Sequence, residues 1–282
     1  RQMCIRDRCY IGFEIKPMAA IVMIAVAAVE GIHFIGKLLK KQIVWKKSVL
    51  ACCLSAVLGI GAAAGGVSAV VGSLHFPVVT DTVLGWQHHM MLGLNKDTNG
   101  GYSQADFDYS TSFSSAEEQH AAELKEIGKR LKDFGVGGYL QHFVKKSARN
   151  YFDGCFGWGG LGETFYTEIF PERGTVLCSL IRSLYYDNTE DTLYRYPALF
   201  RQILWYMVLV LVPFSVFTKR PLDKKRQVAV LSVLGLMLYL QIFEAHARYL
   251  YTFVPIFVFL ATEGIDNLRK YLNQKSERRV KK

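Results

Sequence analysis

Val228-Ala-Val-Leu-Ser-Val-Leu-Gly-Leu-Met-Leu-Tyr-Leu-Gln-Ile-Phe243 is an apolar run that is followed closely by a second one, Leu250-Tyr-Thr-Phe-Val-Pro-Ile-Phe-Val-Phe-Leu-Ala-Thr262. Between them stands Glu244-Ala-His246-Ala-Arg248-Tyr249, which we name the 244–249 link. If both runs cross a bilayer, this link is too short to be a domain. Its ionisable side chains must then lie at the membrane surface or in a cavity just below it. Ionisable groups at that depth are candidates for function.

The rest of the chain shows the same segregation of apolar and charged residues. Of 282 residues, 51% are hydrophobic, yet the formal net charge is +10. Apolar runs of roughly 20 residues, the length that crosses about 30 Å of hydrocarbon, alternate with short basic links and one long polar stretch. Because the Lys and Arg residues cluster beside apolar runs, the positive-inside rule explains the basic excess, and we expect no nucleic-acid partner.

The pattern predicts an all-α polytopic membrane protein with about five transmembrane helices plus a mostly helical extracytoplasmic lobe. Residues 9–72 hold two spans and residues 197–262 hold three, while residues 73–196 form the lobe. Near the start of the third span, Arg201 could reach the interface or face the lobe. The expected spans are Met18–Gly36, Ser48–Leu74 ending near Val71, Pro197–Phe217, Val228–Phe243, and Leu250–Thr262 broken by Pro255.

Three basic segments predict one orientation in the cell membrane. Residues 37–47 carry five lysines and no acid, and residues 218–227 and the tail 263–282 are also basic. If all three are cytoplasmic, five spans place residues 73–196 and the 244–249 link on the extracytoplasmic face and the C-terminus in the cytoplasm.

Local signals predict helices within the lobe. Ser115-Ala-Glu-Glu118 is a capping-box pattern that opens an amphipathic helix, and this helix is expected to end near Phe134, before Gly135. A second helix is expected from about Gly138 to Phe152, and residues 154–162 are expected to form an irregular loop.

The 244–249 link supplies the first candidate site. Arg248 can bind a phosphate in a bidentate way because its guanidinium is planar and always charged. If a helix continues through the link, Glu244 shares a face with Arg248 and can pair with it. The alternative is an interfacial ion pair that ends a helix. We favour an anionic lipid head group, because Tyr249 and other tyrosines surround the link.

Candidate sites within the lobe are less specific. Trp86 and His88 are plausible sugar or phosphate contacts or simple surface residues, and adjacent histidines are a poor chelating pair, so no metal and no cofactor is expected. Residues 97–108 loosely resemble a calcium loop, and Asp106-Phe-Asp108 an Asp-x-Asp motif, but a solvated turn is the safer prediction. Cys155 and Cys178 could pair in an oxidising compartment.

Several stretches resemble the C-terminal half of bacterial C-type membrane glycosyltransferases, which are related to protein O-mannosyltransferases and the aminoarabinose transferase. Glu244-Ala-His-Ala-Arg248-Tyr249-Leu-Tyr251 with Pro255 is similar to the Glu-x-Arg-x-Arg-Tyr…Pro stretch of that family, with His246 in place of its first arginine. Further similar patterns are Trp86–Leu94, Gly101-Tyr102…Asp106 and Lys145-Lys146…Tyr151-Phe-Asp153-Gly154.

This resemblance implies transfer of a sugar from a polyprenyl-phosphate donor to a glycan, lipid or protein acceptor of the cell envelope. Arg248 and His246 would hold the donor phosphate, with Glu244, Tyr249, His88 and Trp86 as further substrate contacts. The resemblance also implies that the catalytic base is an acidic residue of the first external loop, which would lie upstream of this fragment. Residues 1–8 resemble a translated sequencing adapter, and the native sequence is expected to begin near Cys9. The alternatives are a polysaccharide polymerase or ligase, and a non-catalytic transporter or scaffold.

Overall fold

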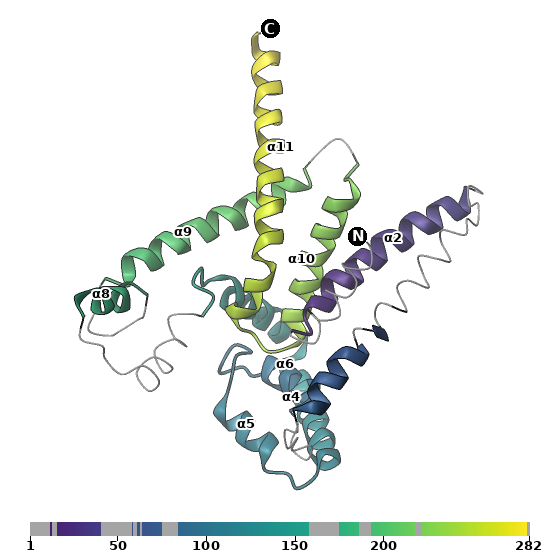
Figure 1. The fold of residues 1–282 in the computed structure, drawn as a ribbon, viewed down its shortest axis with the longest axis vertical. Helices are drawn as coiled ribbons and strands as arrows, with labels where there is room; N and C mark the ends of the chain where they lie inside the picture. The colour runs from purple at the N-terminus through teal and green to yellow at the C-terminus, as the bar shows by residue number, and fades with distance from the viewer. Residues whose placement is uncertain are drawn as a thin grey trace. The chain divides into compact units, whose positions relative to one another are not determined.

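The computed structural model describes residues 12, 16–40, 58, 61–62, 64–74, 84–157, 175–185, 193–217 and 221–280. The regular elements in these ranges are helices, and the described residues contain no strand. The all-α architecture expected from the sequence is therefore confirmed. The chain forms two compact units: Arg1–Thr80 with Leu222–Leu236, and Asp81–Pro221 with Met237–Lys282. Figure 1 labels the helices.

Four helices in the described residues are long and apolar enough to cross a bilayer, and each matches an expected span. They are Ala19–Leu39, Arg195–Ser215, Lys224–Ile242 and Ala247–Ser276. About half of the expected span over residues 48–74 lies outside the described residues, and within the described part Ala64–Ser73 is helical. The adapter-like residues 1–8, residues 41–47 of the first basic link and residues 218–220 of the second also lie outside them.

In the first unit, α2 (Ala19–Leu39) packs against the first turns of α10 (Lys224–Ile242). The Lys224 ammonium lies 2.8 Å from the Glu30 carboxylate, and His33 Nε2 lies 3.0 Å from Gln227 Oε1. Near the other end of the pair, a Cβ added at Gly235 would meet Ile21. Position along α2 therefore rises as position along α10 falls, and the two helices are antiparallel.

In the second unit, the lobe consists of α4 (Trp86–Gly93), α5 (Gln104–Thr111) and α6 (Ala116–Tyr151). The Ser115 side chain accepts from Glu118 N at 3.3 Å, as the capping pattern predicts. At Gly135 the backbone leaves helical geometry (φ 57°, ψ −179°), so α6 is two helical segments joined by a kink. A positive φ favours glycine, which explains why the break falls there. Both predicted helices are confirmed.

The α4 helix is held on α6 by a small apolar core and by polar contacts. The core comprises Met91, Leu94, Ile127 and Phe134. The prediction of a solvated turn over residues 97–108 is wrong in its second half, which is helix α5. Asp106 is buried there and accepts from Arg130 through both oxygens, at 2.9 and 2.7 Å. Both Asp106 carboxylate oxygens are therefore bonded to Arg130, so this carboxylate is not a ligand for a metal ion or a nucleotide sugar.

The remaining helices of this unit are α8 (Val176–Tyr185), α9 (Arg195–Leu211) with η1 (Val212–Ser215), η2 (Ala247–Phe253) and α11 (Val254–Val280). Rings of Trp205 and Phe257 lie 5.3 Å apart, and Asn267 donates to the Phe214 carbonyl at 3.0 Å. Because both positions increase together, α9 and α11 run in the same general direction where they contact each other.

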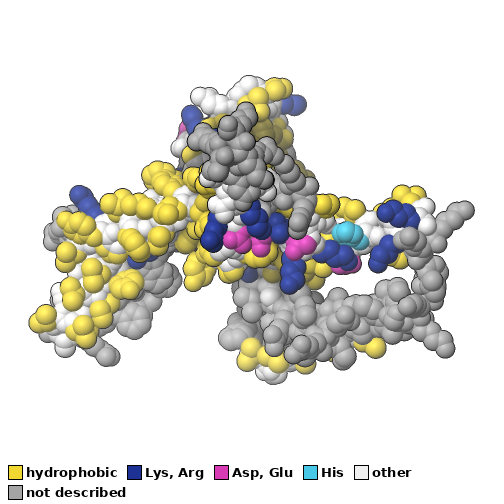
Figure 2. Space-filling model, turned by 90° about the horizontal axis from the view of Figure 1, so that it is seen from above, with side chains coloured by type: hydrophobic (Ala, Val, Ile, Leu, Met, Phe, Trp, Pro, Cys, Tyr) yellow, Lys and Arg dark blue, Asp and Glu magenta, His cyan; other side chains and the backbone are white. Residues whose placement is uncertain are grey.

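Two features of these helices bear on the expected spans. Pro255 does not break the last span; it lies in the first turn of α11, where a missing N–H costs nothing, after the 3₁₀ segment η2. The visible surface of the α8–α9 arm is largely hydrophobic (Figure 2). Leu199, Phe200 and Val210 of α9 are at least 60% exposed, which suits a lipid-facing helix.

Candidate functional site

The 244–249 link is not helical where it begins. The helix α10 ends at Ile242, His246 is extended (φ −154°, ψ 131°), and η2 begins at Ala247. The N–H of Ala245 donates to the Gly100 carbonyl at 2.6 Å, which ties the link to the lobe. No continuous helix therefore places Glu244 and Arg248 on one face, and their expected i,i+4 pairing does not occur.

Glu244 is a buried anion that organises the link. Only 4% of its surface is exposed, Tyr249 Oη donates to its Oε2 at 2.8 Å, and His89 Nδ1 lies 3.7 Å from the same oxygen. Burial alone would raise the pKa of Glu244, but hydrogen bonds from His89 and Tyr249 and the charge of Arg248 lower it below its ordinary value. The Glu244 carboxylate therefore stays ionised and holds Tyr249 and His89 against the start of the link.

Arg248 and His246 play different electrostatic parts. His246 Nδ1 accepts from the backbone N–H of Arg248 at 3.2 Å, so the proton of a neutral ring is on Nε2. Burial, followed by the charge of Arg248, lowers the pKa of His246. Arg248 is exposed, and its guanidinium carbon lies 5.4 Å from the centroid of the Tyr249 ring. The positive charge of the link therefore resides on Arg248.

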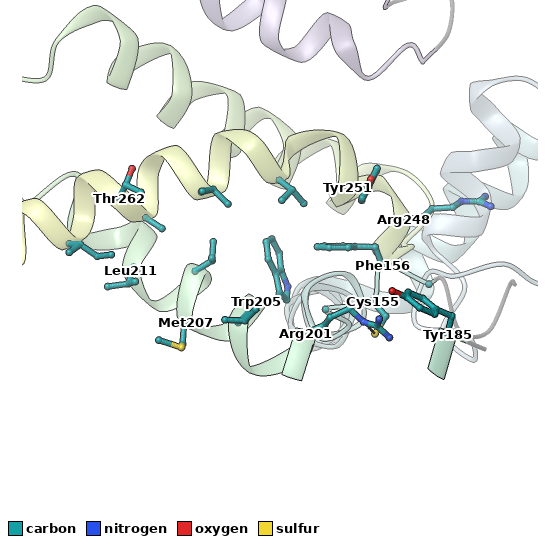
Figure 3. A pocket seen from close by; sticks show the side chains of 18 residues that line it. Cys155, Phe156, Tyr185, Arg201, Trp205, Met207, Leu211, Arg248, Tyr251 and Thr262 are labelled. Atoms are coloured by element: carbon teal, nitrogen blue, oxygen red, sulfur yellow. Dashed lines mark hydrogen bonds between the residues drawn. The ribbon is translucent and has the colours of Figure 1, made fainter. Parts of the chain in front are cut away.

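Arg248 stands at one end of a long apolar groove between α9 and α11 (Figure 3). The groove has a volume of about 1090 Å³. Toward its far end lie Leu211 and Thr262, and at its near end lie Arg201, Arg248 and Tyr251. A groove with this lining can hold a hydrocarbon chain along its length and an anionic group at its near end.

The near end is shaped by the turn Asp153–Gly157, which follows α6. The Asp153 carboxylate accepts from the N–H groups of Cys155 and Gly157. Phe156 and Gly157 both have positive φ, 56° and 77°, an uncommon conformation for a bulky aromatic residue. The Phe156 ring lies 5.1 Å from that of Trp205, so it is fixed across the groove.

Arg201 brings a second guanidinium to the groove from α9. Its Nε lies 3.4 Å from Cys155 Sγ, and its guanidinium carbon lies 5.7 Å from the centroid of the Tyr194 ring. Its Nη2 is buried and has no hydrogen-bond partner among the described residues.

Trp86 and His88 are separated by the structure although they are close in sequence. Trp86 is 54% exposed and remains a candidate contact. His88 is 2% exposed, and its Nδ1 lies 2.7 Å from Ser110 Oγ and 3.9 Å from Glu123 Oε1. Burial, followed by the charge of His89, lowers the pKa of His88. Neither residue lines the groove.

Lys146 joins the lobe to the end of α10. It is fully buried, and its Nζ donates to the carbonyls of Gly93 and Gln241 at 2.7 and 2.9 Å. Burial lowers its pKa to about 7, although the negative charge of Glu244 acts in the opposite direction. Gly93 must be glycine, since an added Cβ would lie 2.7 Å from the carbonyl oxygens of Ile242 and Phe243.

The sequence identified Arg248 but not the groove, and it did not assign Arg201 or Phe156 to the site. The packing of α9 against α11 brings Arg201 to the groove, and the turn that follows α6 brings Phe156 to it. Cys155 and Cys178 are both free thiols. Across the described residues, no group of three His, Cys, Asp or Glu side chains is arranged to hold a metal ion.

Comparison with known proteins gives one match. A family described as conserved hypothetical integral membrane protein matches residues 6–267. No curated protein and no solved structure matches the chain.

Proposed function

The chain belongs to the family of conserved hypothetical integral membrane proteins, and from this premise we propose that it is a membrane glycosyltransferase that uses a polyprenyl-phosphate sugar as donor. The donor's isoprenoid chain occupies the groove between α9 and α11. Its phosphate lies against Arg248 and Arg201. The sugar passes to a glycan, lipid or protein acceptor of the cell envelope.

The observation that carries this proposal is an apolar groove whose near end is lined by two arginines, Arg201 and Arg248. Each CH₂ group removed from water contributes about 0.8 kcal/mol, so the groove favours a long hydrocarbon chain. Guanidinium groups bind phosphate through bidentate, charge-assisted hydrogen bonds. Arg201, which lines the same end of the groove as Arg248, supplies a second guanidinium for the phosphate oxygens.

The same charges suit the chemistry of transfer. An acceptor hydroxyl oxygen attacks the anomeric carbon, the bond from that carbon to the phosphate oxygen breaks, and its electron pair remains on the lipid phosphate. The acceptor's proton passes to a base, which we do not assign to a residue. Arg248 stabilises the charge that develops on the leaving phosphate, because its guanidinium is always positively charged. The Nε2–H of His246 is a further donor beside it.

The orientation follows from charge. We propose that residues 73–196 and the 244–249 link face the extracytoplasmic side and that the C-terminus is cytoplasmic, with Trp86 available to stack on the sugar or the acceptor. In the first unit, α2 and α10 are antiparallel, and the end of α2 lies beside the start of α10. Lys37 and Lys40 at the end of α2 and Lys224 and Lys225 at the start of α10 therefore belong to the same end of this helix pair.

Binding is tested first, with the purified full chain in detergent and native mass spectrometry. The probes are a polyprenyl phosphate and the polyprenol of the same length. We expect the phosphate to bind more tightly than the alcohol, and Arg248→Ala to weaken phosphate binding by about tenfold to a hundredfold, the effect of losing charge-assisted hydrogen bonds of about 1.5–3 kcal/mol. Equal binding of phosphate and alcohol by the unaltered chain would refute the donor site.

Arg269→Ala is the matched control. It removes an arginine from the exposed surface of α11, outside the groove, and should leave both affinities unchanged. Transfer is then measured in membranes containing the full-length protein and a radiolabelled donor. Arg248→Ala should abolish transfer while membrane insertion persists, and near-normal transfer by this variant would contradict the assignment.

The transfer assay also separates the alternatives. A transferase releases polyprenyl phosphate and adds one sugar to the acceptor. A polymerase or ligase joins a preassembled saccharide and so yields a product longer by more than one sugar. A transporter or scaffold leaves the sugar–phosphate bond intact.

A further inference from the structure

The segment of α6 after its kink carries an exposed apolar surface that no described residue covers. We name residues 136–151 the distal half of α6. Its buried face consists of His142, Lys146 and Asn150, which pack within the second unit. Several large apolar side chains point elsewhere and are exposed: Val136 83%, Leu140 62%, Phe143 40% and Val144 66%.

The exposed surface is divided into two sectors. The spacing i, i+4, i+7 and i+8 places the four apolar residues on one side of the helix, and Ala148 extends this row by a turn. Gln141, Lys145 and Arg149, each four residues from the next, form a second exposed row beside the first. A buried face, an apolar sector and a cationic sector therefore follow one another around a single helix.

The distal half of α6 lies against the end of α10, and the residue that follows α6 contacts α9 within its length; both α9 and α10 have the length and composition of membrane spans. Lys146 and Ser147 both contact Gln241, which lies one residue before the end of α10. Near the end of α6, Phe152 is 68% exposed, and its ring lies 6.5 Å from that of Tyr206 on α9. The apolar surface thus continues from α6 onto the exposed apolar side chains of α9.

We propose that the distal half of α6 lies in the interfacial layer of the bilayer, with its apolar sector among the acyl chains and its cationic sector at the lipid phosphates. Its partner is the surface of an anionic lipid membrane. Amphipathic helices with basic polar faces bind such surfaces by burying their apolar side. Charge complementarity favours lipid over a second protein, since Lys145 and Arg149 would oppose their counterparts in a symmetric copy.

The test places a photoreactive benzoylphenylalanine at one exposed position at a time in the full-length chain. The apolar-sector variants replace Leu140 or Val144, and the matched controls replace their neighbours Gln141 or Lys145. Each protein is reconstituted into vesicles of phosphatidylcholine and phosphatidylglycerol, irradiated and digested, and lipid adducts are measured by mass spectrometry. We expect a several-fold higher yield of acyl-chain adducts at positions 140 and 144 than at 141 and 145.

Two results would overturn the proposal. One is an equal adduct yield in both sectors; the other is crosslinking of positions 140 and 144 to a peptide of a second copy. A nitroxide attached to cysteine at Ala148 gives an independent measurement if a photoreactive variant misfolds. Collisions with oxygen should exceed collisions with a water-soluble nickel chelate there, whereas the reverse ratio means that this surface faces water.

Discussion

Replacing Lys146 by methionine should change how the stability of the protein depends on pH. Lys146 is fully buried, and burial lowers its pKa to about 7 in the folded protein. In the unfolded chain a lysine has a pKa of about 10.4. The unfolded state therefore binds more protons between these values, and the free energy of unfolding rises with pH across this window. Methionine has no titratable group, so the Lys146→Met variant lacks this contribution to the pH dependence of stability.

The size of the effect follows from the two pKa values. Integrating the difference in bound protons shows that the free energy of unfolding of the unaltered protein rises by about 2 kcal/mol between about pH 7 and about pH 9. The corresponding value for Lys146→Met lacks this rise. The neutral amine still has two N–H donors, enough for the carbonyls of Gly93 and Gln241. Deprotonation therefore relieves the cost of burying the charge without breaking either hydrogen bond.

The assay is equilibrium unfolding in mixed detergent micelles at several pH values, followed by tryptophan fluorescence. Lys145→Met is the matched control, because Lys145 is the exposed neighbour on the same helix. The control should follow the unaltered protein at every pH. If the Lys146→Met curve runs parallel to that of the unaltered protein throughout, Lys146 does not carry a depressed pKa, and the reasoning fails.

Three further changes have expected outcomes. Asp106→Ala should lower the free energy of unfolding by about 2–3 kcal/mol, because it leaves the Arg130 guanidinium without its buried partner, whereas Asp108→Ala, at an exposed position of α5, should have little effect in the same unfolding assay. Gly157→Ala should weaken binding of polyprenyl phosphate in native mass spectrometry, because the residue has a φ of 77° and an added Cβ would lie 2.6 Å from His246 Cε1; unchanged binding would show that this turn does not shape the site. An enzyme reporter inserted in residues 120–130 should be active on the extracytoplasmic side, and a cytoplasmic signal would overturn the proposed orientation.

Local signals predicted the helices of the lobe, and tertiary contacts decided the burial of their side chains. The cap at Ser115 and the break at Gly135 depend on neighbouring residues alone, so both could be located from the sequence. Ser103 caps α5 in the same way, accepting from Asp106 N, but this shorter signal was interpreted as a turn. The burial of His88 depends on α5 and α6 folding over it, which no local pattern reveals.

The charge pattern of the sequence predicts where the candidate site lies, but it does not predict the geometry of that site. Arg248 was identified because a guanidinium between apolar runs is costly. Its separation from Glu244 arises because α10 ends before the link and Tyr249 takes the carboxylate. The role of Lys146 could not be inferred, since its partners Gly93 and Gln241 are distant in the chain.

The groove and the arginines make separable contributions to binding. An apolar groove discriminates weakly among lipids, because any chain of sufficient length removes a similar area from water. Discrimination between a phosphate and an alcohol must then come from Arg201 and Arg248, whose charges would lack a counterpart beside an uncharged head group. Loss of either arginine should therefore weaken binding of polyprenyl phosphate and leave binding of polyprenol almost unchanged. A groove substitution such as Val258→Asn, which is polar but uncharged, should weaken both ligands equally, and this contrast distinguishes a phosphate site from a general lipid-binding surface.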